Sequence, residues 1–221
     1  MTRAPALLAV LAAACVLSTA AWGAVDPRAP QQRHTAADTR LARTLGLRLS
    51  DLAAGWKLEP PQPQGPPCAT EPDESTLVQT ARVDPSFLYK DGVTEVGSEV
   101  DIFKTAAMDK ADWVLSSLKV TGTCLLADAK LSLSKQGTVT LVQAVALKPP
   151  GLAARSLHFR FVLALRGART VDIVTDIVAL SQGRVTVVLH SLSLGSPIPA
   201  SSLKALTTTL AGRLPEVGTS I

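Results

Sequence analysis

The stretch that decides the fold runs from residue 157 to residue 194 and reads LHFRFVLALRGARTVDIVTDIVALSQGRVTVVLHSLSL. Short links that contain Gly167 and Gly183 interrupt it. Links of this length join only antiparallel strands, because a parallel pair needs a crossover of about a dozen residues. The sequence therefore predicts three consecutive antiparallel strands, over Leu157–Leu165, Val171–Ala179 and Val185–Ser193.

On the N-terminal side of this stretch, a strand is predicted to begin with Trp56 and Leu58 and to end at the prolines of residues 60–67. Further strands are predicted over Val93–Phe103, Leu131–Ser134 and Val139–Leu147. In the run from Val93 to Phe103, apolar or small residues alternate with Glu95, Glu99 and Asp101. Alternation with period two is typical of a half-buried strand. Like charges also deter edge-to-edge pairing, so we expect an edge strand with a solvated acidic face.

Helical spacing of apolar residues occurs from Leu41 to Ala54, over residues 106–119 and over residues 203–214. Gly122 is expected to end the middle helix. One apolar face of an antiparallel meander must be covered, and the two later helices are available to cover it. The predicted fold is α+β: an antiparallel sheet of about five to seven strands, covered by two amphipathic helices and closed by one disulfide.

The N-terminus has the pattern of a secretory signal peptide over residues 1–23. Arg3 precedes an apolar run from Leu7 to Leu17, and small residues precede Ala24. A retained anchor helix and a lipid anchor on Cys15 remain alternatives. Residues 24–45 are expected to form a flexible tether and residues 46–215 a single α+β domain. The predicted location is secreted, or the extracellular side of the cell envelope.

Cys68 and Cys124 are the two cysteines outside the signal peptide. An even number of cysteines in an exported protein predicts a disulfide between them. Such a crosslink contributes on the order of 4 kcal/mol in the chain-entropy model. Two buried free thiols are the alternative. Zinc is disfavoured, because neither cysteine has a second ligand two to four residues away.

Composition argues against several classes of function. The net charge is only +4 and no run of Lys or Arg concentrates it, so no nucleic-acid partner is expected. The three histidines are scattered, which disfavours a metal site, and no glycine-rich phosphate loop precedes a helix. A Gly-x-Ser-x-Gly nucleophile motif is also absent from the sequence. We therefore expect no cofactor, no metal and no membrane span after signal removal.

One polar row in the decisive stretch could form a site. If Leu163 faces Ile173 across the first hairpin, Arg160 falls opposite Asp176. The register of the next turn could place His190 beside them. The row is a low-ranking ligand-binding candidate beside the alternative of a solvated face with cross-strand ion pairs. Its members are His158, Arg160, Asp172, Asp176, Arg184 and His190. Valines predicted on the same face imply that a loop, the N-terminal segment or a ligand covers it.

The order of motifs resembles a known group of proteins. The motifs are Leu-x-x-Gly-Trp at 52–56, Cys68, Phe87, Ser-Glu-Val-Asp-Ile-Phe at 98–103, Cys124, the strands of 172–194 and Pro-Ile-Pro at 197–199. This pattern is similar to exported actinobacterial proteins related to the extracellular sensor domain of mycobacterial serine/threonine kinases, and to small mycobacterial lipoproteins. The resemblance implies a Mog1/PsbP-like fold with a cleft proposed to bind a ligand. The kinase sensor domain has two disulfides where this chain can form one.

Three functions follow as hypotheses. The first is a non-catalytic envelope module that binds an apolar or amphipathic small molecule or a partner protein, motivated by the 47% hydrophobic residues. The second is a secreted hydrolase that uses His190 or His158 with Asp176. The third is a structural envelope protein that associates through an open sheet face.

Overall fold

The computed structural model describes residues 26–60 and 68–214. The predicted signal peptide, with Cys15, lies outside the described residues. The strands are β1 (Gln31–Gln32), β2 (Trp56–Leu58), β3 (Val78–Val83), β4 (Ser86–Tyr89), β5 (Glu95–Phe103), β6 (Thr138–Ala146), β7 (Arg155–Arg166), β8 (Thr170–Gln182) and β9 (Val185–Leu194). The helices are α2 (Ala36–Leu45), the 3₁₀ turn η1 (Leu49–Asp51), α3 (Ala106–Leu115), α4 (Leu118–Ser132) and α5 (Ala200–Arg213).

The strands form one nine-stranded sheet in the order β1-β3-β5-β9-β8-β7-β6, and β4 joins β5 to β2. The chain from β6 to β9 runs as three consecutive antiparallel hairpins, as the decisive stretch predicts. The short pairing of β1 with β3 is parallel. The sheet is thus larger than the five to seven strands expected, because β1, β3 and β4 were not predicted.

Both faces of the sheet are buried. One face carries Val178, Leu180 and Val187, and it packs against Leu45 of α2 and Leu210 of α5. The opposite face carries Leu163 and Ile173, which pack against Leu125, Leu126 and Ala129 of α4. A strand buried on both faces needs apolar residues at odd and even positions. This explains the continuous Val, Ile and Leu content of β8.

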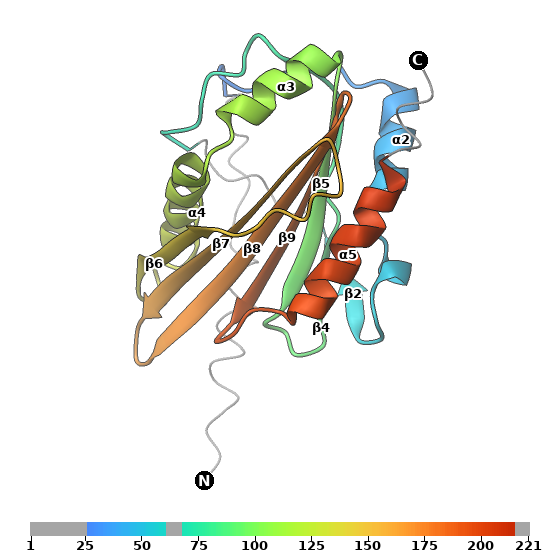
Figure 1. The fold of residues 1–221 in the computed structure, drawn as a ribbon. Coiled ribbons are helices and arrows are strands. Elements are labelled where there is room, and N and C mark those ends of the chain that lie inside the picture. The colour runs from blue at the N-terminus through green and yellow to red at the C-terminus, as the bar shows by residue number, and fades with distance from the viewer. Residues whose placement is uncertain (1–25, 61–67, 215–221) are drawn as a thin grey trace.

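The helices lie on both sides of the sheet rather than on one (Figure 1). The sequence expectation of two covering helices on a single face is therefore corrected. The face predicted to carry an open polar row is covered by α2, α5 and the chain between β6 and β7, whose Ala153 packs against that core. The hypothesis of a structural protein that associates through an open sheet face therefore lacks support, because this face is covered.

The predicted tether over residues 24–45 is also corrected. Within its described part, β1 pairs with β3, and α2 buries Ala42 and Leu45 at 0% and 2% exposure. Thr35 caps α2 by accepting a hydrogen bond from the N–H of Asp38. The N-terminal segment is therefore one of the covers that the valines on this face imply.

The region after α3 differs from the sequence expectation as well. Gly122 does not end a helix but lies inside α4, where a Cβ would come within 2.8 Å of Phe161 Cε1. Glycine here permits close approach of helix and sheet rather than termination. The predicted strand over Leu131–Ser134 is instead the end of α4 and the turn after it. Leu131, which is 58% exposed, belongs to the last turn of α4, and Leu133 is the buried C-cap of that helix.

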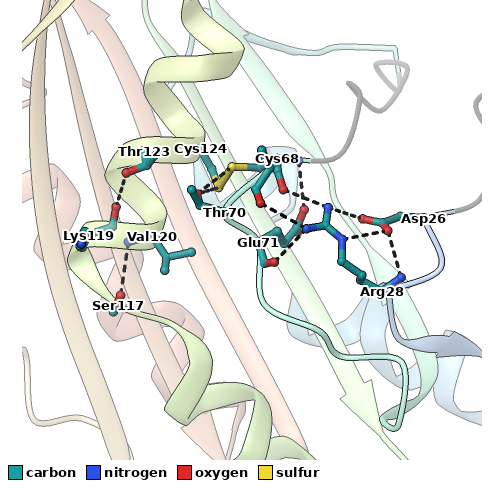
Figure 2. The surroundings of a disulfide bond; sticks show 11 residues. Asp26, Arg28, Cys68, Thr70, Glu71, Ser117, Lys119, Val120, Thr123 and Cys124 are labelled. Carbon is teal, nitrogen blue, oxygen red and sulfur yellow. Dashed lines mark hydrogen bonds and ion pairs between the residues drawn. A yellow bond between two sulfur atoms is a disulfide. The ribbon is translucent and has the colours of Figure 1, made fainter.

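The predicted disulfide joins Cys68 to Cys124, with an S–S distance of 2.11 Å across a sequence separation of 56. It ties α4 to the loop that leads into β3 (Figure 2). Arg28 donates hydrogen bonds to the carbonyl oxygens of Cys68 and Glu71, and it pairs with Asp26. The disulfide and Arg28 together fasten α4, this loop and the N-terminal segment to one another.

A buried carboxylate holds α3 on the sheet. Asp109 is 0% exposed, and it accepts hydrogen bonds from Ser181 Oγ at 2.7 Å and Thr186 Oγ1 at 2.8 Å. The guanidinium of Arg155 pairs with the same carboxylate and lies over the ring of Trp113. A buried charge with this many partners is satisfied. Asp109 therefore positions α3 over β8 and β9.

Candidate functional site

Three members of the predicted polar row meet on the face covered by α2 and α5. Leu163 pairs with Ile173, and Arg160 lies directly opposite Asp176, in the register expected. Arg160 binds Asp176 through Nε at 2.9 Å and Nη2 at 3.0 Å. His158 Nε2 lies 2.9 Å from Asp176 Oδ1. The hairpin register alone thus assembles a His-Arg-Asp cluster.

Within this cluster, His158 and Arg160 are hydrogen-bond partners of the Asp176 carboxylate. The Asp176 side chain is 1% exposed. Burial by itself would raise the pKa of Asp176, but hydrogen bonds from His158 and Arg160 hold that pKa below its usual value. The carboxylate is therefore held in its charged form with its partners in place. Such an arrangement stabilises the hairpin, and it leaves Asp176 little capacity to take up a proton from a substrate.

The other three members of the row lie elsewhere. Asp172 is exposed near the start of β8. Arg184, in the β8–β9 turn, donates to both carboxylate oxygens of Asp38 on α2, at 2.6 and 3.0 Å. His190 pairs with Ile177, one position away from the Asp176 register, and therefore points to the opposite face. The expected joining of His190 with Arg160 and Asp176 is corrected by this one-residue difference.

His190 lies over a glycine in the neighbouring strand. Gly97 of β5 pairs with His190 of β9, and a Cβ on Gly97 would sit 2.3 Å from Nε2 of the imidazole. Gly97 therefore provides the space that the ring occupies. No hydrogen bond or ion pair reaches the His190 side chain from residues 26–60 and 68–214. Burial lowers the pKa of His190 even though the carboxylates of Glu95, Glu99 and Asp84 favour its charged form.

Carboxylates of β5 flank His190 on the same face. Glu95 and Glu99 lie two residues before and after Gly97, so all three share one side of the strand. Ser86 Oγ of β4 donates a short hydrogen bond to Glu95. Arg82 Nη2 of β3 donates to Glu99 Oε2 at 2.6 Å. The imidazole therefore sits between two oriented carboxylates, each held by a neighbouring strand.

Asp101 continues this acidic row into the protein interior. It accepts a hydrogen bond of 2.6 Å from Gln79 Nε2 and is 8% exposed. Burial, and secondarily the charge of Glu99, raises the pKa of Asp101 well above its usual value. The expectation of a solvated acidic face on an edge strand is corrected, because β5 lies between β3 and β9 and part of its acidic face is buried.

A hollow of about 550 Å³ is lined by His190, Glu95 and Glu99, and we call it the His190 hollow. Its polar lining comprises His190, Arg43, Arg82 and the carboxylates of Glu59, Asp84, Glu95 and Glu99. Its apolar lining includes Leu47, Leu58 and Val83. Ligand sites in proteins typically enclose about 300–1,000 Å³ with a few convergent polar groups in an apolar wall. The His190 hollow has both features.

A second hollow of about 430 Å³ lies between the loop before β3 and α3, with Leu77, Ala107 and Val114 in its wall. Val114 is 71% exposed there. Asp73 and Lys110 at its edge have opposite charges. It lacks the unpartnered imidazole that distinguishes the His190 hollow.

The described residues contain no group of three or more His, Cys, Asp or Glu side chains arranged to ligate a metal ion. In the same part of the chain, no helix is long and apolar enough to span a bilayer. Ser98, next to Gly97, is 0% exposed, and its Oγ accepts a hydrogen bond of 2.8 Å from the N–H of Leu47. Ser98 therefore connects β5 to the segment after α2.

Sequence reasoning included His190 but placed it on the wrong face and dismissed the carboxylates around it. The pattern Glu-x-Gly-x-Glu at 95–99 is the sequence signal that could have indicated this candidate site. A glycine inside an alternating strand marks a place where another group approaches closely. Which group approaches Gly97 depends on the pairing of β5 with β9, and that pairing is not local in sequence.

Comparison with known proteins gives a structural likeness. No family model and no curated protein sequence matches the chain. The extracellular domain of PknH from Mycobacterium tuberculosis is similar, with a TM-score of 0.45 and 10% identity over 80% of this chain and 96% of that one. A putative uncharacterized protein from Mycobacterium smegmatis has a TM-score of 0.43 and 9% identity over 80% and 95% of the two chains. Both similar structures come from mycobacteria, the group to which the motif resemblance also points.

Proposed function

We propose that this protein is a non-catalytic binding module of the cell exterior, which holds a small amphipathic molecule in the His190 hollow. The observation that carries the proposal is the His190 imidazole, which lines a hollow of ligand size without a protein hydrogen-bond partner among the described residues. A polar group in a recessed site favours a ligand that supplies the missing partner.

The shape of the hollow supports an amphipathic rather than a fully polar ligand. Leu58 is 62% exposed, and it lines the hollow together with Val83. A ligand chain that covers Leu58 removes apolar surface from water, which contributes about 25 cal/mol per Å² buried. The polar end of the same molecule would meet the imidazole and carboxylates.

An exported location is supported by the disulfide, because such bonds form and persist in oxidising compartments. The non-catalytic role is supported by the state of the His158–Asp176 pair. Its distance of 2.9 Å suits a catalytic dyad, yet Arg160 occupies both carboxylate oxygens of Asp176. His190, in turn, lies on the opposite face from Asp176 and shares no hydrogen bond or ion pair with it.

The proposal is tested by native mass spectrometry of the protein purified from its own secretion medium. We expect a bound small molecule in the wild-type protein and its loss in Leu58→Ser. Leu131→Ser is the matched control, since Leu131 on α4 is 58% exposed but does not line the hollow. Equal occupancy in the two variants, or protein that is bare and takes up no eight-carbon amphiphile, would contradict the proposal.

A further inference from the structure

The His190 hollow has an excess of negative charge. Four carboxylates line it against the guanidinium groups of Arg43 and Arg82, and one of the four, Glu59, pairs with Lys57 at 3.8 Å. Arg82 is already paired with Glu99. Glu95 has a neutral partner, Ser86, and no cation pairs with Glu95 or Asp84 among residues 26–60 and 68–214. The site therefore offers carboxylate charge that the described protein does not neutralise.

The imidazole of His190 adds an acceptor to this charge. Burial favours its neutral form, in which one ring nitrogen carries a lone pair. The ring is held between β5 and β9 over Gly97, so it cannot turn far from the hollow. A neutral acceptor flanked by carboxylates is complementary to a group with several N–H donors and a positive charge. An anionic head group would meet repulsion at the same place.

We infer that the ligand of the His190 hollow carries a protonated amine, which lies over the imidazole within reach of Glu95 and Glu99, while its apolar part covers Leu58. This inference rests on the proposed function and names the chemical class of ligand. The His190 imidazole supports this inference independently of the carboxylates, because it is recessed and has no hydrogen-bond partner in the described part of the chain. Arg82 orients Glu99 and is left in its existing ion pair.

The test compares three ligands with one eight-carbon chain: n-octylamine, n-octanol and octanoate. Isothermal titration calorimetry of the wild-type protein should show n-octylamine binding at least about fivefold more tightly than n-octanol, with octanoate weakest. Glu95→Gln, which keeps an acceptor for Ser86, should weaken amine binding about fivefold and leave n-octanol unchanged. Asp128→Asn, an exposed acid on α4, should change neither.

The outcomes separate the inference from the proposed function. Equal binding of the three ligands would overturn the amine inference while the hollow remains a binding site. Tightest binding of octanoate would also overturn it, because Arg82 and Arg43 would then hold an anion. Absence of binding by all three would contradict both the inference and the proposed function.

Discussion

The imidazole of His190 occupies the space that a side chain on Gly97 would fill, since a Cβ at Gly97 would lie 2.3 Å from Nε2 and 2.5 Å from Cε1. The two residues are direct partners across β5 and β9. Glycine at 97 is thus matched to histidine at 190, and His190 lines the hollow that carries its name. Each depends on the other for its position.

Gly97→Ala should destabilise the protein by about 1 to 3 kcal/mol, because the added methyl group overlaps the imidazole. His190→Ala in the same chain should remove most of this cost. Urea unfolding of the two single variants and the double variant measures the coupling between them. Additive losses in the double variant would show that the two residues do not share this space.

Asp176→Asn should cost about 2 kcal/mol, because it leaves the Arg160 guanidinium in a half-buried site without its counter-charge. Asp172→Asn on the same strand should change stability by less than about 0.5 kcal/mol, since Asp172 is exposed. The stabilisation from Asp176 is present above its unfolded pKa of 3.8 and is lost as pH falls through its lower folded pKa. Thermal melts should therefore show the difference between wild type and Asp176→Asn shrinking as pH falls below 3.8. A constant difference would contradict this account.

Asp112 of α3 should have the opposite pH dependence. Burial, followed by the charges of Asp109 and Glu99, raises the pKa of Asp112 to about 7. Its folded form keeps a proton that the unfolded chain releases near pH 3.8, so its stabilising contribution is full below that pH and is lost as pH rises through 7. Asp112→Asn, a neutral substitute, should melt several degrees above wild type at pH 8 and match it at pH 4. A difference in melting temperature that does not vary with pH would contradict the raised pKa of Asp112.

Two helical glycines should respond to alanine with opposite signs. Gly212 of α5 is exposed with open space around it, so Gly212→Ala should stabilise the protein by about 0.5–1 kcal/mol through helix propensity. Gly122→Ala in α4 should destabilise it, because the new methyl group would lie 2.8 Å from the Phe161 ring. Chemical denaturation measures both. Stabilisation by both substitutions would contradict the close approach of α4 to β7.

Much of the sheet could be predicted because its signals are local. The hairpins of β6 to β9 follow from alternating residues and short turns, and the pairing of Arg160 with Asp176 follows from the register of a single hairpin. The valines on both faces of β8 correctly implied a second cover. The disulfide followed from the cysteine count.

The parts of the fold and of the candidate site that could not be predicted depend on contacts between distant parts of the chain. The segment with α2 is polar in sequence, yet Ala42 and Leu45 suffice to anchor it because β3, β5 and α5 supply the rest of the core. Gly122 could not be distinguished from a helix terminator without the position of Phe161. Burial of Asp101 depends on Gln79 of β3, a strand that its own sequence did not reveal.

Nuclear magnetic resonance of histidine-labelled protein tests the central claim most directly. The chain has three histidines, so the exposed His34 and the paired His158 serve as internal controls for His190. On titration with n-octylamine or n-octanol, we expect the ring signals of His190 to shift and those of His34 and His158 to stay in place. Shifts at His158 with His190 unchanged would place the binding site on the opposite face of the sheet and contradict the account.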